Sequence, residues 1–95
     1  MENYELTESA KEDLIRIHHY GVARFGISQA DKYYYNFFTH FELIASNPYS
    51  FESISYIKEG YRRCVCGIDS IIYKISGNKV VIISIIGRQD IDQLL

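Results

Sequence analysis

The sequence predicts an α+β fold, with a short N-terminal strand and an α-helical hairpin packed on a C-terminal antiparallel β-sheet. Residues 61–66, 71–73 and 79–86 are rich in β-branched and aromatic residues and are separated by turn-forming residues, which indicates a three-stranded meander. Residues 8–45 instead repeat apolar residues at helical spacing. Because the helical and strand segments do not alternate along the chain, the helices should gather on one face of the sheet.

Length and charge limit the possible functions. Ninety-five residues suffice for one domain with a single core, but not for a separate catalytic lobe. The net charge is −2, whereas proteins that neutralise phosphates are usually basic, so we expect no direct nucleic-acid binding. No apolar run reaches the roughly 18 residues of a membrane span, and residues 1–4 do not resemble a secretory leader. We therefore expect a cytoplasmic protein that does not bind membranes.

The first two predicted elements are a strand at residues 4–6 and a helix at residues 8–25. The strand alternates polar and apolar residues, and Thr7 after it is a good helix N-cap. Gly26 is predicted to end the helix. Apolar residues three or four positions apart form one stripe along the helix: Ala10, Leu14, Ile17, Gly21 and Phe25.

A second helix is predicted to start at Ser28 and to form an antiparallel hairpin with the first helix through Gly26-Ile27. Ser28 and Asp31 resemble a capping box with Asp in place of Glu. Asn47-Pro48 should end this helix, because the residue before a proline avoids the helical region. The apolar stripe of the second helix consists of Ala30, Tyr34, Phe37, Phe41, Ile44 and Ala45.

The second helix carries more aromatic residues than one stripe can hold. Tyr33, Tyr35 and Phe38 lie beside the stripe. Either the stripe is wide enough to cover both the first helix and the sheet, or some of these rings form a second face that is exposed for a partner. The sequence leaves both interpretations open.

The remaining residues are predicted to form the sheet and its connections. Residues 49–59 should be a packed loop with a short strand before Gly60. Within strand 61–66, Arg62 and Arg63 point to opposite faces, so each face of an otherwise apolar strand carries one arginine. Ser76-Gly77-Asn78 suits a tight turn between the last two strands. The tail after Asp90 is either one helical turn or disordered.

The two cysteines are expected to be small core residues in a reducing compartment. Cys64 and Cys66 point the same way on one strand, a spacing that does not readily close a disulfide. A zinc site would need further ligands at suitable spacing, and His18, His19 and His40 do not provide them. We therefore expect neither a metal nor a cofactor.

Several short segments, none specific alone, occur in a characteristic order and spacing. They are Tyr4-Glu5-Leu6-Thr7 with Ala10 and Asp13-Leu14, Gln29-Ala30, Asn47-Pro48, Glu59-Gly60-Tyr61-Arg62, Gly67, Ile72-Tyr73 and Ile85-Ile86-Gly87-Arg88-Gln89-Asp90. Nearly the whole chain thereby resembles the ParE branch of the RelE/ParE toxin family of bacterial toxin-antitoxin systems. The chain departs from the family pattern at Asp69, where many members have His, and at Ser84 and Ile86, where they have Arg or His.

The resemblance implies a type II toxin, and the family contains two activities. ParE-type members poison DNA gyrase and have no demonstrated catalytic site, whereas RelE-type members are ribosome-dependent mRNA endonucleases. Cleaving RNA through its own 2′-hydroxyl needs a general base, a general acid and cations within hydrogen-bond reach. The last tyrosine here is Tyr73, in the middle of the sheet, and the tail offers acids and leucines instead of a base. The chemistry therefore favours gyrase, with no catalytic residues.

The resemblance also implies candidate contact residues and partners. Arg62, Arg63 and Arg88 are the candidates for target binding at the rim of the sheet, and Tyr33, Tyr35 and Phe38 for binding a cognate antitoxin in a hetero-oligomer. Two alternatives stay open: a RelE-type endonuclease that uses the same arginines, and an inert module that binds only its antitoxin. Arg62 could also be structural, paired with Glu59, Asp69 or the C-terminus of a helix.

Overall fold

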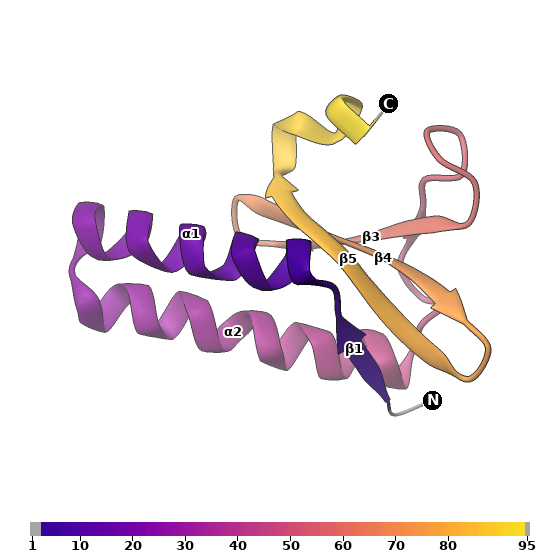
Figure 1. The fold of residues 1–95 in the computed structure, drawn as a ribbon, viewed down its shortest axis with the longest axis horizontal. Helices are drawn as coiled ribbons and strands as arrows, with labels where there is room; N and C mark the ends of the chain where they lie inside the picture. The colour runs from indigo at the N-terminus through magenta and orange to yellow at the C-terminus, as the bar shows by residue number, and fades with distance from the viewer. Residues whose placement is uncertain (1–2, 95) are drawn as a thin grey trace.

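The computed structural model describes residues 3–94, and it has the predicted α+β architecture (Figure 1). The chain forms two long helices and a five-stranded sheet, followed by a short 3₁₀ segment. The elements are β1 (Tyr4–Leu6), α1 (Glu8–Phe25), α2 (Ile27–Ser46), β2 (Glu52–Ser53), β3 (Tyr61–Cys66), β4 (Asp69–Ser76), β5 (Lys79–Gly87) and η1 (Arg88–Leu94). No helix in the described part of the chain is long and apolar enough to cross a membrane.

The strands are arranged in the order β1-β5-β4-β3-β2. The predicted meander is present, since β3 pairs antiparallel with β4 and β4 with β5. β1 pairs parallel with β5, with Tyr4 opposite Val80 and Leu6 opposite Ile82, so the sheet is mixed and not antiparallel throughout. A parallel pair needs a long crossover connection, and here the helical hairpin and three other strands lie between the two partners in the sequence.

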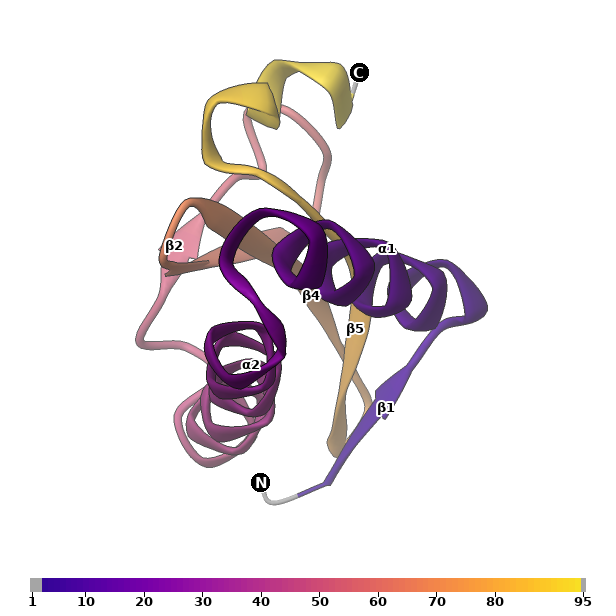
Figure 2. The same cartoon turned by 90° about the vertical axis from the view of Figure 1, so that its left-hand side faces the viewer.

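The helical hairpin lies on one side of the sheet and projects past it at the end where α1 meets α2 (Figures 1 and 2). Gly26 ends α1 with a φ of 88° and donates its N–H to the carbonyl of Val22. A positive φ is readily adopted only by glycine, and it lets the chain reverse at once into α2. Gly21 and Ala30 bring the two helices close, because a Cβ on Gly21 would lie 3.2 Å from the Cβ of Ala30.

The predicted capping box of α2 is wrong. The helix starts at Ile27 with Gly26 as its N-cap, and no side chain caps it. Ser28 is exposed within the first turn, and the carboxylate of Asp31 instead lies 2.8 Å from Nε2 of His18 on α1. The tight reversal at Gly26 leaves no extended residue at position 28 to act as a cap, and it places Asp31 beside α1.

The core lies between the helices and the sheet, as the apolar stripes predict. Helix residues and strand residues form one buried cluster: Ala10, Leu14, Ile17, Phe37, Phe41, Ile44, Cys64, Cys66, Ile71, Tyr73, Val80, Ile82 and Ile85. The hydroxyl of Tyr73, which is fully buried, donates to the carbonyl of Pro48 at 2.7 Å, and burial raises the pKa of this side chain to about 12. This bond holds the C-terminal end of α2 against the middle of the sheet.

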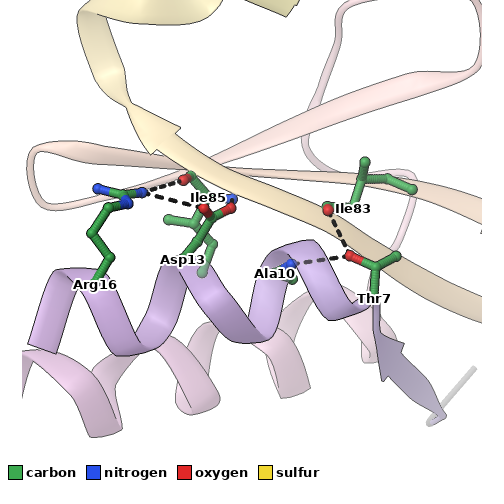
Figure 3. Close-up of polar contacts among 6 residues, drawn as sticks. All are labelled: Thr7, Ala10, Asp13, Arg16, Ile83 and Ile85. Atoms are coloured by element: carbon green, nitrogen blue, oxygen red, sulfur yellow. Dashed lines mark hydrogen bonds and ion pairs between the residues drawn. The ribbon is translucent and has the colours of Figure 1, made fainter.

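Side chains of α1 cover the edge of β5 beyond the end of β1 (Figure 3). The hydroxyl of Thr7 accepts the N–H of Ala10 as an N-cap and donates to the carbonyl of Ile83 at 2.7 Å. One turn further, Asp13 accepts the N–H of Ile85 at 2.9 Å, and Arg16 donates to the Ile85 carbonyl at 3.3 Å. These bonds satisfy main-chain groups that a bare edge strand would offer to another chain.

The long loop contains the short strand that the sequence predicts, and the tail is helical. Residues 49–60 contain the two-residue strand β2 and a turn in which Ile54 is fully buried. The tail is a 3₁₀ segment that lies against β4 and β5 and is anchored by the Arg88 N–H, which donates to the Ile68 carbonyl at 2.8 Å. Of the two predictions for the tail, the helical one is therefore right within residues 88–94.

Candidate functional site

Arg62 holds the segment after α2 against β3. Its Nη1 donates to the carbonyl of Phe51 at 2.8 Å and lies 3.5 Å from that of Tyr49, and its guanidinium lies 5.3 Å from the centre of the Tyr49 ring. Within the described residues it forms no ion pair with Glu59 or Asp69. Its partners are main-chain carbonyls just beyond the C-terminus of α2, which is one of the structural roles considered for this arginine.

Arg63 and Arg88 have different environments. The guanidinium of Arg63 contacts Glu52 of the neighbouring strand β2 at 3.1 Å from Nη2 and 3.2 Å from Nε, and its side chain is only 18% exposed. Arg88 is exposed, and within residues 3–94 its side chain has no hydrogen bond or ion pair. Arg63 is level with Ile72 and Ser84 across the sheet, so the end of β5 at Gly87 lies roughly 10 Å further along the strand direction. The three arginines therefore do not converge on one point.

Tyr33 clamps the turn between β3 and β4. Its hydroxyl lies 2.8 Å from Oδ2 of Asp69 and 2.9 Å from the Cys66 carbonyl, and it accepts the N–H of Ile68 at 3.2 Å. Gly67 lies against the hydroxyl end of the ring with a φ of 61°, and a Cβ there would lie 2.6 Å from Cε1 of Tyr33. The ring is therefore half-buried and engaged within the molecule.

Tyr35 and Phe38 differ in exposure. Tyr35 is 66% exposed, whereas Phe38 is half-buried and packs against the core. The wide-stripe interpretation therefore holds for Tyr33 and Phe38, and Tyr35 is the ring of the three that faces solvent. The sequence could not separate these cases, because all three residues lie beside the stripe and only their neighbours differ.

A continuous row of rings runs along the helices from β1 toward the hairpin tip. Consecutive ring centres are 5.3 to 5.5 Å apart in the order Tyr4, Phe41, Phe38, Tyr34 and His18. Only Phe41 in this row is fully buried, and the other four are half-buried. We call these five residues the aromatic row. It places partly exposed apolar surface along the α1–α2 hairpin.

Two acid–base contacts exist in the described part of the chain, and both lie away from the arginines of β3. One is His18 with Asp31 between the helices, and the other is Tyr33 with Asp69 at the β3–β4 turn. Asp69 is 8% exposed, and this burial, together with the charges of Asp13 and Asp90, raises its pKa, while the Tyr33 hydroxyl and Arg16 oppose the rise.

The cysteines are buried, as predicted. Burial raises the pKa of both Cys64 and Cys66 to about 11, so neither is a ready thiolate. The described residues contain no group of three or more Cys, His, Asp or Glu side chains suited to a metal ion.

Sequence reasoning missed three of these features. The contacts of Tyr33 with residues 66–69, of Asp31 with His18, and of α1 with Ile85 all join residues far apart in the chain. Only the spacing of Asp13 and Arg16, three residues apart on a helix, gives a local signal that the two side chains could act together.

Comparisons with known proteins agree with this architecture. Residues 4–92 match the family model of the ParE toxin of the type II toxin-antitoxin system parDE. The chain is 34% identical over 86 residues to Toxin ParE1 of Caulobacter vibrioides, covering 90% of this chain and 88% of that protein. Its fold is similar to a chain of the chromosomal ParDE TA system from P. aeruginosa, with a TM-score of 0.81 at 18% identity, covering 92% and 96% of the two chains. The chain therefore belongs to the ParE toxin family of type II toxin-antitoxin systems.

Proposed function

We propose that this ParE toxin acts in the cytoplasm by binding and blocking DNA gyrase, and that a cognate antitoxin neutralises it in a hetero-oligomer. The proposal assigns no catalytic step to the toxin itself. It rests on membership of the ParE family and on the way the arginines of the sheet are used.

The separation of Arg62 and Arg63, the arginines of β3, from the acid–base pairs is the observation that carries this proposal. An endonuclease would need cations, a base and an acid around one phosphate. Arg62 bonds to main-chain carbonyls and Arg63 to Glu52, whereas the pairs formed by His18 and Tyr33 lie elsewhere. The net charge of −2 also suits a protein partner better than RNA.

Arg88 is the arginine best placed to meet the target. It is exposed, and its main-chain N–H donates a hydrogen bond to the carbonyl of Ile68. The side chain of Ile68 is 73% exposed. Val65, near the end of β3, is 38% exposed. A cation beside apolar side chains is typical of protein-binding surfaces, where Arg is enriched. We assign Arg62 and Arg63 the role of holding the neighbouring segments in place.

The antitoxin would bind the helical hairpin. The aromatic row, together with the exposed Tyr35, offers apolar surface along both helices, and Ile15 beside it is 56% exposed. Such a strip suits an amphipathic peptide segment that wraps the toxin. In this proposal Tyr33 and Phe38 contribute through their packing and Tyr35 through direct contact.

The experiment is to produce the chain without antitoxin and to measure DNA supercoiling by gyrase and, separately, translation in a cell-free system. We expect supercoiling to be inhibited and translation to be unaffected. Ribosome-dependent cleavage of mRNA would replace the proposal with a RelE-type activity, and no effect in either assay would identify an inert antitoxin-binding module.

Two variants make the assay specific. Arg88→Ala should weaken inhibition of supercoiling without lowering the melting temperature, because the side chain has no partner in the described structure. Arg24→Ala is the matched control, since Arg24 is also exposed but lies on the helical hairpin, beside Tyr20. Equal inhibition by wild type and Arg88→Ala would exclude Arg88 as a target contact.

A further inference from the structure

A pocket of about 300 Å³ lies between α1 and α2 at the end of the aromatic row. It is lined by Ile15, His18, His19, Asp31, Tyr34 and Tyr35. Four of these six side chains are aromatic rings or imidazoles, and one is a carboxylate. Lys and Arg are absent from the lining that the structure describes.

The pocket contains one carboxylate, that of Asp31, which is hydrogen-bonded to His18. The Asp31 side chain is 48% exposed, and its Oδ1 lies 2.8 Å from Nε2 of His18. A carboxylate can only accept, so a neutral His18 must carry its proton on Nε2. The imidazole orients the carboxylate through Oδ1, and the second carboxylate oxygen has no hydrogen bond within the part of the chain that the structure describes.

The rings provide the other feature that favours a cation. The Tyr34 ring meets the His18 ring edge-on at 5.4 Å, and it meets the Tyr35 ring at 5.5 Å with an interplanar angle of 82°. Both tyrosines line the same pocket as the Asp31 carboxylate. Elsewhere in the described residues a cation lies over a tyrosine ring three times, as Arg24 with Tyr20, Lys58 with Tyr61 and Arg62 with Tyr49. In the described structure Tyr34 and Tyr35 have no such cation, although a carboxylate lies next to them.

We propose that this pocket receives an arginine side chain from the toxin-binding segment of the antitoxin, an inference that rests on the proposed function. A planar guanidinium can stack on a tyrosine ring and bond to a carboxylate at the same time, which an ammonium cannot do as well. The half of the chain that contains the pocket is acidic, since residues 1–52 carry eight acidic and four basic side chains. The aromatic row continues from the pocket and gives the apolar residues of the same segment a surface to pack on.

The first test uses a small probe and the full chain. N-acetyl-arginine amide is titrated into isotope-labelled toxin, and chemical shifts of the pocket residues are followed by NMR. Asp31→Asn should weaken binding about five-fold, the loss expected for one exposed ion pair. Asp92→Asn, the same substitution on η1 outside the pocket, should change nothing. N-acetyl-norleucine amide should not shift the same resonances. Equal binding to wild type and Asp31→Asn would overturn the proposal.

The second test uses the antitoxin itself. Each arginine of its toxin-binding segment is replaced by alanine, and affinity is measured for wild-type toxin and for Asp31→Asn in a double-mutant cycle. We expect one arginine whose loss costs several-fold in affinity with wild type and much less with Asp31→Asn. A complex that forms with no arginine coupled to Asp31 would overturn this inference alone. Failure to find any antitoxin complex would overturn the proposed function as well.

The alternative occupant of the pocket is the exposed Arg24 of a second copy of the toxin. Sedimentation of the isolated toxin distinguishes this self-association from antitoxin binding. A concentration-dependent dimer that is lost in Asp31→Asn would assign the pocket to self-association and overturn the proposal, whereas identical monomeric behaviour of both chains supports it.

Discussion

Asp13 and Ile85 lie 72 residues apart in the sequence, and the carboxylate of Asp13 accepts the N–H of Ile85 at 2.9 Å. Arg16 donates to the carbonyl of the same residue, so both main-chain polar groups of Ile85 on β5 are bonded to side chains of α1. The contact fixes the position of α1 along the sheet and closes an edge that β1 is too short to cover.

Replacing Asp13 by Ala should therefore destabilise the toxin and open this edge. The N–H of Ile85 would lose its acceptor in a part-buried position, which costs about 1–3 kcal/mol. Urea unfolding measures the loss, and sedimentation measures self-association through the opened edge. Glu12→Ala, at the exposed neighbouring position, is the control. Equal stabilities for the two variants would show that the Asp13 bond contributes nothing.

Gly67→Ala should be more destabilising than Gly77→Ala. Both glycines have nearly the same positive φ, 61° and 62°, so the backbone penalty is matched. A Cβ on Gly67 would meet the Tyr33 ring at 2.6 Å, whereas a Cβ on Gly77 would have no neighbour within 4 Å in the described structure. The difference in unfolding free energy between the two variants isolates the clash. A smaller cost of Gly67→Ala in a Tyr33→Ala background than in the wild type would identify the ring as its cause.

Asp69→Asn should change how stability depends on pH. Burial raises the pKa of Asp69 in the folded chain, so its contribution is most favourable below the unfolded pKa and is lost as pH rises through the folded pKa. Asn keeps the shape and an acceptor for the Tyr33 hydroxyl but cannot ionise. Relative to wild type, Asp69→Asn should therefore gain stability from about pH 4 toward pH 7. Urea midpoints measured across this range would contradict the prediction if the two curves stayed parallel.

Arg62→Lys should lower stability together with toxicity. A lysine ammonium cannot bond the Phe51 carbonyl and stack on the Tyr49 ring in the way the guanidinium does. A loss of about 1 kcal/mol would lower the melting temperature by roughly 4–8 °C in a domain of this size. The melting temperature measured by calorimetry and the growth inhibition caused by the toxin should then fall together. An unchanged melting temperature with lost toxicity would make Arg62 a direct target contact instead.

Much of the fold follows from local patterns in the sequence. Helical spacing of apolar residues located α1 and α2, and β-branched runs located β3, β4 and β5. Thr7, Gly26 and Pro48 marked the helix boundaries. The hydroxyl of Thr7 caps α1, the positive φ of Gly26 ends it, and Pro48 restricts the residue before it, and each of these effects acts within a few residues. The ordered segments from Tyr4 to Asp90 also identified the family, which the comparisons confirm.

The candidate sites depended on tertiary structure. Which face a side chain occupies follows from periodicity, but which group it meets there depends on the elements that pack beside it. For this reason Arg62 bonds to carbonyls instead of an acid, Asp31 pairs with His18 instead of capping α2, and β1 joins β5 in parallel. The sequence by itself determined the elements and the family. Only long-range packing decided which tyrosines and arginines remain available to a partner.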